Sequence, residues 1–572
     1  MLADKDLLSI QEVRTKVDKA FAAWQKYRAY SQEQVDAIVE RMAAAARANA
    51  RVLAEEAVEE TGYGNAKDKY IKNLLCCDWL PRRMRCMKTI GVIRELPEEK
   101  LVEIGVPVGV VAAILPTTNP TSTAIYKVLI SLKAGNGIVL SPHPRAHRCT
   151  CHTAAILYQA AVEAGAPEDI IQCVDTATIE GTNALMRHER TGVILSTGGA
   201  GIVRAAYSSG KPAFGVGPGN VPVLLDVSAD LEDAVPKIVA GKSFDYGTVC
   251  SSEQAIVTEK SVRDRVISLL KANKAFICNE QQKSALASLL VSSGFTINPN
   301  CVGQAPTKLA KMAGFDVPAD TSILCVEDTG VGKKHPLSME KLSPVLSLYF
   351  VDNFAAALEI CHALLKFGGA GHTAVIHSRD ENHIREYGLR MPAMRILVNT
   401  PSPQGSTGIT TNVFPAMTLG CGAVAGNITG DNVSPRHLMN TKRIAYVARR
   451  PEQAFEMPLD INQAPQRAAA AAAAGADGPV DRSAVASAVE RFLASRGLAQ
   501  QPAPAAAPVS GGPSCACESK APAAPAASPK QEVTRDMVAA IAAEVVDRFL
   551  SQNGRSSPPP KPSGNGDSGG YG

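Results

Sequence analysis

Apolar runs rich in β-branched residues alternate with helix-like stretches through the first part of this chain. GIVLS at 137–141 and GVILST at 192–197 are two such runs, and the segment 150–165 between them carries apolar residues at helical spacing. Strands that alternate with helices predict an open α/β sheet. Ligands of such sheets bind where the carboxyl ends of the strands meet helix N-termini. We therefore look for a functional site in the loops that follow these runs.

The size and charge of the chain exclude several classes of protein. With 572 residues the chain is too long for one core and predicts two to four domains. A formal charge of +4 is small for this length and gives no electrostatic footprint for nucleic acid. The N-terminal residues include Asp and Lys where a signal peptide would be apolar, and we find no run long enough to span a membrane. We expect a cytoplasmic protein that binds neither nucleic acid nor membrane.

The fourteen cysteines are expected to be reduced thiols, because they lie at irregular spacings in a long chain without a secretion signal. Cys149, Cys151 and His152 resemble a metal-binding cluster, but a second pair of ligands is missing from the spacing. We predict no metal site.

The composition changes after about residue 460. Residues 461–527 are rich in Ala and Pro and predict a linker with one short helix, whereas 554–572 predict a disordered terminus. Residues 528–553 begin with a capping-box pattern and carry one apolar stripe: Val533, Met537, Ile541, Val545 and Phe549. An isolated helix of this length is marginal in water and gains stability by docking. The pattern favours a partner-binding helix, with folding back onto its own domain as the alternative.

Cys250 stands among small and hydroxylated residues in DYGTVCSSEQ, 245–254. Small neighbours leave room for a substrate beside a nucleophilic thiol. A buried structural thiol is the alternative, and this stretch alone does not exclude it.

Four ordered segments together resemble the aldehyde dehydrogenase superfamily: 105–146 with PTTNP, 192–203 with STGGAG, 245–257 around Cys250, and 340–350 with EKLSPV. The resemblance covers about residues 6–450. It implies an α/β fold with a Rossmann-type cofactor domain, an α/β catalytic domain and a largely disordered tail that carries short amphipathic helices. The expected boundaries are 1–235 for N-terminal helices and the NAD-binding domain, 236–410 for the catalytic domain, and 411–460 for the return to the cofactor domain.

The resemblance also implies roles for particular residues. Cys250 would attack an aldehyde carbon, and the Asn119 amide would donate to the developing oxyanion. Without the resemblance, Asn119 is equally a turn-former before Pro120. The residues implied to bind NAD are Thr118, Ser141, Pro142, His143, Thr197, Gly198, Gly199, Gly217 and Glu340. Glu340 would hold the nicotinamide ribose, with an exposed helix-start glutamate as the alternative. The usual lysine of the loop at 141–143 is missing, so the choice between NAD and NADP stays open.

One departure from the family pattern narrows the range of reactions that we expect this chain to catalyse. Hydrolytic members have a glutamate that activates water, whereas Gly215 stands at the matching position in AFGVGPGNVP. Without that base, hydrolysis of a thioacyl-enzyme should be slow, while a thiol needs less help. This pattern, together with GGAGHTAVIHS, resembles the CoA-acylating branch, which oxidises propionaldehyde or acetaldehyde to the acyl-CoA. His372 could lie near the reacting centre or the CoA thiol, or make a structural hydrogen bond. A hydrolytic dehydrogenase and a non-catalytic scaffold remain the alternatives.

The resemblance extends to partners. Members of this branch from bacterial microcompartments often carry a short amphipathic helix on a flexible linker, so residues 528–553 are expected to dock on a shell or cargo protein inside a microcompartment. Residues 436–455 resemble the oligomerising strand region of the family, and we expect a homo-oligomer.

Overall fold

A computed structural model describes residues 4–292 and 294–455, and the single residues 483, 487 and 491. The chain divides into two units, 1–459 and 460–572, and the fold below is that of the first. The expected linker at 461–527, helix at 528–553 and terminus at 554–572 therefore lie outside the described residues, apart from those three positions.

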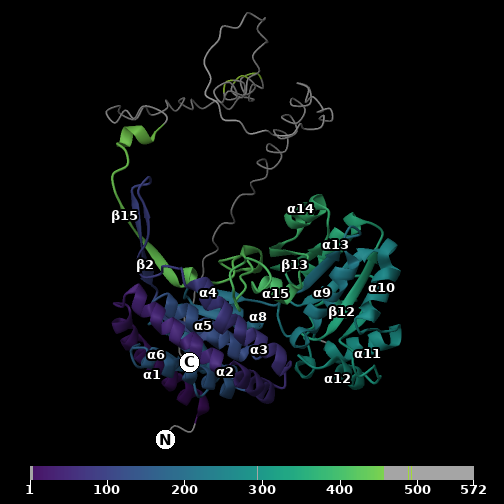
Figure 1. The fold of residues 1–572 in the computed structure, drawn as a ribbon, viewed down its shortest axis with the longest axis horizontal. Helices are drawn as coiled ribbons and strands as arrows, with labels where there is room; N and C mark the ends of the chain where they lie inside the picture. Colours follow the sequence, from purple (N-terminus) through teal and green to yellow (C-terminus); the bar gives the residue numbers. More distant parts are fainter. Residues whose placement is uncertain (1–3, 293, 456–482, 484–486, 488–490, 492–572) are drawn as a thin grey trace, which may run out of the picture. The chain divides into compact units, whose positions relative to one another are not determined.

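The first half of this unit is built on a five-stranded sheet with the order β5-β4-β3-β6-β7, in which every pair is parallel. Its strands are β3 (Val110–Ile114), β4 (Gly137–Ser141), β5 (Ile171–Cys173), β6 (Thr191–Thr197) and β7 (Ala213–Val216). Its helices are α1 (Lys5–Tyr27), α2 (Gln32–Thr61), α3 (Ala66–Leu74), α4 (Leu80–Met84), α5 (Pro120–Lys133), α6 (His147–Glu163), α7 (Ile179–Arg187) and α8 (Ala200–Tyr207). The helices α1, α2 and α6 appear in purple and blue in Figure 1.

The second half is built on a seven-stranded sheet with the order β10-β11-β12-β9-β8-β13-β14, again parallel throughout. Its strands are β8 (Val221–Leu225), β9 (Glu253–Glu259), β10 (Ala275–Ile277), β11 (Ile323–Glu327), β12 (Val345–Val351), β13 (Gly371–His377) and β14 (Ala393–Val398). Its helices are α9 (Leu231–Ser243), α10 (Arg263–Ala272), α11 (Glu280–Leu290), α12 (Pro306–Met312), α13 (Phe354–Gly368), α14 (Glu381–Arg390) and α15 (Ser402–Ser406).

The predicted α/β fold is confirmed, and the structure shows that its two main sheets are parallel, with the strands β3, β4 and β8 fully buried as such sheets require. The predicted boundary between residues 235 and 236 falls inside α9 and stays a prediction. The strand β8 already pairs with β9 and β13, so the second half begins before Val221. No change of composition marks this point.

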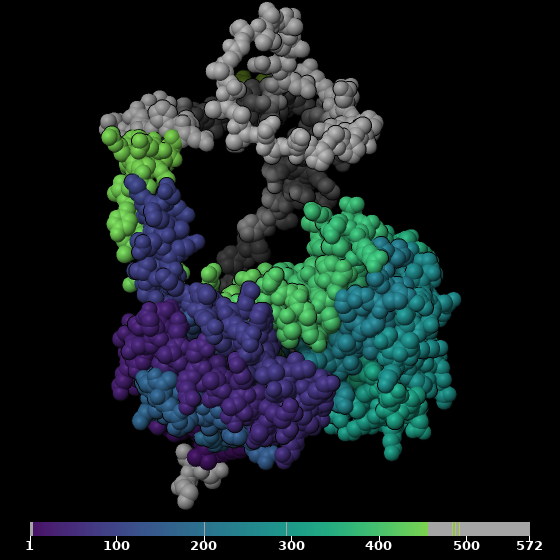
Figure 2. Space-filling view, in the orientation of Figure 1, coloured from purple at the N-terminus to yellow at the C-terminus, as the bar shows by residue number. Residues whose placement is uncertain are grey.

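A third, antiparallel sheet has the order β1-β2-β15 and joins β1 (Gly91–Leu96) and β2 (Leu101–Pro107) to β15 (Met439–Ala445). Figure 2 shows the blue β1–β2 hairpin and the green β15 standing clear of the helices as an arm. All residues of β15 after Met439 are exposed. The segment before β15 returns to the first half, where Leu419, Val433 and Leu438 join the core around β3 and α5.

The described residues also bear on membrane-spanning helices and on the state of the cysteines. Among the residues that the structure describes, no helix is long and apolar enough to cross a membrane. Each of the twelve cysteines in the described ranges is a free thiol.

Candidate active site

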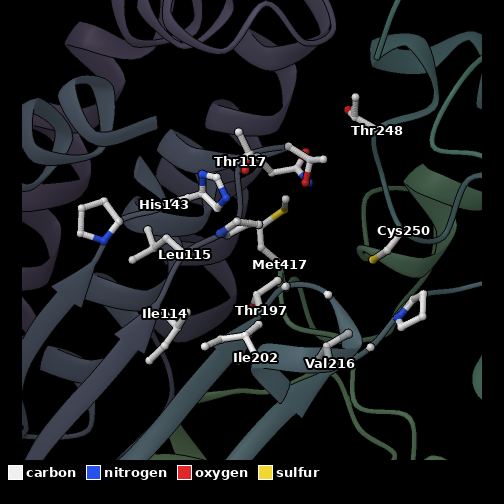
Figure 3. Close-up of a pocket in the computed structure, with 18 of the residues that line it drawn as sticks. Ile114, Leu115, Thr117, His143, Thr197, Ile202, Val216, Thr248, Cys250 and Met417 are labelled. Atoms are coloured by element: carbon white, nitrogen blue, oxygen red, sulfur yellow. The ribbon is translucent and has the colours of Figure 1, made fainter. Parts of the chain in front are cut away.

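A cavity of about 530 Å³ lies at the carboxyl edge of the first sheet and is also lined by residues of the second half. The loops after β3, β4, β6 and β7 form one wall, and the loop that precedes β9 faces them. In Figure 3 Cys250 and Thr248 lie on one side of the cavity, opposite His143, Leu115 and Ile114. The structure places eleven of the predicted residues in this cavity: Thr118, Asn119, Ser141, Pro142, His143, Thr197, Gly198, Gly199, Gly217, Cys250 and Glu340.

The remaining predicted residue, His372, lies behind Cys250. It is fully buried on β13, and its Nε2 is 3.3 Å from Cys250 Sγ. Its Nδ1 is 3.0 Å from the hydroxyl oxygen of Thr373. Both alternatives for His372 therefore describe part of its surroundings. Its Nδ1 makes a structural hydrogen bond with Thr373, and its Nε2 faces the Cys250 thiol.

Burial keeps both members of this pair uncharged. It raises the pKa of the Cys250 thiol to about 12, and the nearby carboxylate of Glu340 adds to the rise. Burial also holds the pKa of His372 well below its usual value, with a further contribution from the positive charge of Arg395. A neutral imidazole beside a thiol is a proton acceptor that can act at the moment the sulfur attacks.

Asn119 ends the loop between β3 and α5. It occupies the N-cap position of α5, with Pro120 as the first helical residue, but its side chain makes no capping hydrogen bond. Instead its Oδ1 accepts from Lys72 Nζ, and its Nδ2 donates to the Thr118 hydroxyl at 3.0 Å. The side chain is therefore held by groups other than its own helix, and the turn-former alternative does not account for these contacts.

Glu340 precedes β12 and is 9% exposed, so the exposed-glutamate alternative is wrong. Its Oε1 accepts from the backbone N–H of Gly219 at 3.2 Å. Burial raises the pKa of Glu340 to about 8, against the opposing effects of the Gly219 hydrogen bond and Lys242.

The wall opposite Cys250 leaves room for a phosphate-bearing cofactor. A Cβ atom added at Gly199 or Gly217 would meet no atom within 4 Å, so both glycines border open space. Gly199 is the N-cap of α8, whose N-terminal N–H groups favour a negatively charged ligand. Together with the buried carboxylate of Glu340, this arrangement fits a dinucleotide.

Comparison with known proteins decides the family. A sequence model described as "Aldehyde dehydrogenase family" matches residues 2–285. Succinate-semialdehyde dehydrogenase (acetylating) of Clostridium kluyveri is 39% identical over 440 residues, which cover 77% of this chain and 96% of that protein. This chain belongs to the aldehyde dehydrogenase family, in its acylating branch.

Another relative is much longer. The bifunctional aldehyde-alcohol dehydrogenase of Escherichia coli K12 is 42% identical over 443 residues, which cover 76% of this chain and 50% of that protein. The chain therefore spans about half the length of such bifunctional dehydrogenases.

Solved structures of aldehyde dehydrogenases agree with the fold. An acetylating aldehyde dehydrogenase from Geobacillus thermoglucosidasius is 48% identical with a TM-score of 0.78, covering 80% of this chain and 100% of that one. A propionaldehyde dehydrogenase from the fucose utilisation bacterial microcompartment of Clostridium phytofermentans is 27% identical with a TM-score of 0.68, covering 75% and 96%.

A side chain has no free space at Gly215, the position at which the resemblance places the glutamate of hydrolytic members. Gly215 lies in β7, and a Cβ atom there would be 2.7 Å from Val203 Cγ1 and 2.9 Å from the Tyr207 hydroxyl oxygen. That hydroxyl donates to the Gly215 carbonyl and accepts from its N–H, both at 3.0 Å. Among the described residues that line the cavity, Glu340 is the single carboxylate.

Cys149, Cys151 and His152, which resemble a metal-binding cluster in the sequence, do not form one in the structure. His152 pairs with Glu56 at 2.8 Å, and Cys149 is buried. His147, Cys151 and Asp175 instead have donor atoms within 4.8 Å of one another. Cys151 Sγ already lies 2.7 Å from Cys173 Sγ, and Asp175 pairs with Lys16 at 2.6 Å, so these groups have partners within the protein.

Four charged residues around the site had no signal in the sequence: Lys69, Lys72, Asp245 and Arg395. Arg395 donates to the carbonyl oxygens of His372 and Gly420, at 2.8 and 2.7 Å, and so fixes the strand that carries the imidazole.

Proposed function

We propose that this chain oxidises a short aldehyde, such as propionaldehyde or acetaldehyde, to its acyl-CoA, with NAD as the oxidant and Cys250 as the nucleophile. The observation that carries the proposal is the 3.3 Å contact between Cys250 Sγ and His372 Nε2 at a cavity shared with Asn119 and Glu340. A scaffold protein would not need these groups in one place.

In the first step, the Cys250 sulfur adds to the carbonyl carbon while His372 Nε2 accepts the thiol proton. The Asn119 amide and the backbone N–H of Cys250 donate to the oxygen that becomes negative. Such donors, each held in place in advance, are worth about a hundredfold or more in rate. The product is the anion of a thiohemiacetal on Cys250, with the thiol proton on His372.

The second step is the oxidation, for which bound NAD supplies a hydride acceptor. Glu340 would hold its nicotinamide ribose, and Gly198, Gly199 and the N-terminus of α8 would hold its pyrophosphate. The collapse of the oxyanion leaves a thioester between the acyl group and Cys250. Glu340 also accepts from the Gly219 N–H, which fixes the carboxyl in the position from which it would hold the ribose.

In the third step, the CoA thiol attacks the thioester and the Cys250 sulfur leaves. His372, which has released to solvent the proton it took in the first step, takes the proton of the CoA thiol and returns it to Cys250. The balance is aldehyde, CoA and NAD⁺ going to acyl-CoA, NADH and a proton. Water is the weaker acceptor here, because Gly215 offers no carboxylate to deprotonate it and Tyr207 and Val203 fill the adjacent space.

Steady-state kinetics test this function. Purified protein with propionaldehyde and NAD should form NADH rapidly when CoA is present, in a one-to-one ratio with propionyl-CoA, and slowly when CoA is absent. Turnover to the free acid without CoA would support a hydrolytic dehydrogenase, and no turnover under any condition would support a scaffold. Cys250→Ser serves as the inactive control.

We also propose that residues 528–553 deliver the enzyme to a bacterial microcompartment by docking their apolar stripe on a shell or cargo protein. The capping-box start and the apolar stripe support this role, as does the similarity to a dehydrogenase from such a compartment. A fluorescent protein fused to residues 528–553 should form puncta in cells with intact shells. The matched control carries Met537→Asp and Val545→Asp, and equal diffuse fluorescence from both fusions would refute the proposal.

A further inference from the structure

A fully buried carboxylate lies five residues before the nucleophile. Asp245 has no exposed surface, and its backbone adopts the left-handed region with φ of 47°. Its Oδ1 accepts from the Asn65 N–H at 2.8 Å, and its Oδ2 accepts from the Thr248 hydroxyl at 2.5 Å and Lys69 Nζ at 3.1 Å. A buried carboxylate with this many donors is ionised and rigidly held.

The most informative partner of Asp245 is Lys72. Lys72 comes from α3, is 3% exposed and donates to Asp245 Oδ2. The same ammonium donates to Asn119 Oδ1 and lies 3.4 Å from the Thr248 hydroxyl oxygen. One cation therefore links α3, the loop that ends at Cys250, and the amide expected to stabilise the oxyanion.

This contact decides which way the Asn119 amide faces. The two ends of an asparagine amide have almost the same shape, but one donates and the other accepts. An ammonium can only donate, so it selects the carbonyl end. The Nδ2 end then turns away from Lys72 and donates to the hydroxyl of Thr118, and both residues line the cavity. A reversed amide would present its oxygen to the developing negative charge and would oppose the reaction.

We propose that Lys72, held by Asp245, is a positioning residue for the oxyanion site: it fixes the Asn119 amide with its N–H toward the substrate oxygen. The proposal rests on the proposed role of Cys250 and Asn119 in acyl transfer. It assigns Asp245 and Thr248, in the loop of the nucleophile, to the same unit, so that the nucleophile and the oxyanion donor are held by one network.

Lys69 provides a matched control. It is 2% exposed, also lies on α3 and pairs with the same carboxylate oxygen, but its second hydrogen bond goes to the Thr118 carbonyl at 2.9 Å and not to Asn119. Lys69→Met and Lys72→Met each remove one cation from Asp245. Only Lys72→Met also removes the hydrogen bond to the Asn119 amide oxygen.

The test uses a reaction that needs neither NAD nor CoA. Acylation of Cys250 by p-nitrophenyl acetate passes through a tetrahedral oxyanion, and the burst of p-nitrophenolate measures its rate. This burst reports on Lys72 even if the proposed dehydrogenase activity fails. Lys72→Met should lower the burst rate about 10- to 100-fold, the scale expected for disturbing one oxyanion donor. Lys69→Met should lower it less than about threefold, because Lys72 still donates to Asn119 Oδ1 and the oxyanion donor is kept.

A double-mutant cycle separates positioning from general damage. In an Asn119→Ala background, Lys72→Met should change the burst rate less than about twofold, because its target is gone. Lys72→Gln keeps an N–H donor without the charge and should recover part of the rate. It also replaces Lys72→Met if that variant has lost its wild-type circular dichroism spectrum.

Two results would overturn the proposal. One is an equal loss from Lys72→Met with and without Asn119. The other is a burst from a folded Lys72 variant that equals that of wild type.

The pH profile gives a second readout. Burial lowers the pKa of Lys72 to about 8, against the raising effect of Asp245. The protonated amine is the form that selects the carbonyl end of Asn119, so the wild-type burst rate should carry an alkaline limb near this pH, superimposed on the rise due to the thiol. The limb should be absent in Asn119→Ala. An alkaline limb that is unchanged in Asn119→Ala would contradict the proposal.

Discussion

At the scale of single residues, the reacting pair is uncharged at rest. A thiol with a pKa of about 12 beside a neutral imidazole differs from a permanent thiolate–imidazolium pair. In the proposed mechanism, the sulfur becomes nucleophilic when His372 accepts its proton.

This state predicts how Cys250 reacts with iodoacetamide. Only thiolate reacts, and below its pKa the thiolate fraction rises about tenfold for each pH unit. The alkylation rate should therefore climb without a plateau from about pH 7 to about pH 10. Mass spectrometry of the Cys250 peptide, counted apart from the exposed Cys86, gives the rates. A plateau below pH 9 would show a stabilised thiolate and contradict the account.

Gly215 predicts a stability effect with a built-in control. Gly215→Ala forces a Cβ atom against Val203 and Tyr207 and should lower the free energy of unfolding by about 1–3 kcal/mol. Gly217→Ala places its Cβ in the open cavity, so its melting temperature should stay at the wild-type value while its affinity for NAD falls. Differential scanning fluorimetry checks the first effect and fluorescence titration with NADH the second. Equal melting temperatures for Gly215→Ala and wild type would contradict this prediction, because they would show that β7 accommodates the added methyl group.

At the scale of elements, β15 is an edge strand with little covering it in the described unit. Ile444 is 43% exposed, and Val447, just after the strand, is 83% exposed. An unpaired strand edge with apolar side chains is a surface for pairing with another chain. We propose that a second copy of the chain covers this arm.

Ile444→Asp combined with Val447→Asp should therefore convert the expected homo-oligomer into monomers, because each buried charge would face an apolar partner surface. Size-exclusion chromatography with light scattering gives the mass. Val52→Asp, at a 48% exposed site on α2, is the control for an added surface charge. An unchanged mass in the double variant would place the interface elsewhere.

The elements also show what could be predicted and what could not. Parallel strands followed by helices were predictable, since each leaves a local pattern of β-branched runs and helical spacing. Cys250, Asn119 and Glu340 were found through ordered motifs. Lys72 was not, because its partners Asn119 and Asp245 are distant in sequence and no local pattern marks a lysine that will be buried. The pairing of β8 with β9 and β13 has no local signal for a similar reason, since the partner strands are distant in sequence.

At the scale of the whole described unit, the cavity draws on both α/β halves. The first supplies Asn119 and the glycine-bearing loop after β6, and the second supplies Cys250, His372 and Glu340. Each half therefore contributes to both proposed roles, since Asn119 of the first half belongs to the oxyanion site and Glu340 of the second half to the ribose site. The fate of the acyl group on Cys250 then depends on which nucleophile, CoA or water, attacks the thioester in this cavity.

The central claim is that CoA, and not water, removes the acyl group from Cys250, and one measurement tests this claim directly. The enzyme is incubated with propionaldehyde and NAD without CoA, desalted rapidly, and followed by intact-protein mass spectrometry. We predict one propionyl group on Cys250 that persists in buffer and disappears on addition of CoA, with stoichiometric propionyl-CoA as the product. Release of free propionate at the same rate with and without CoA would contradict the account.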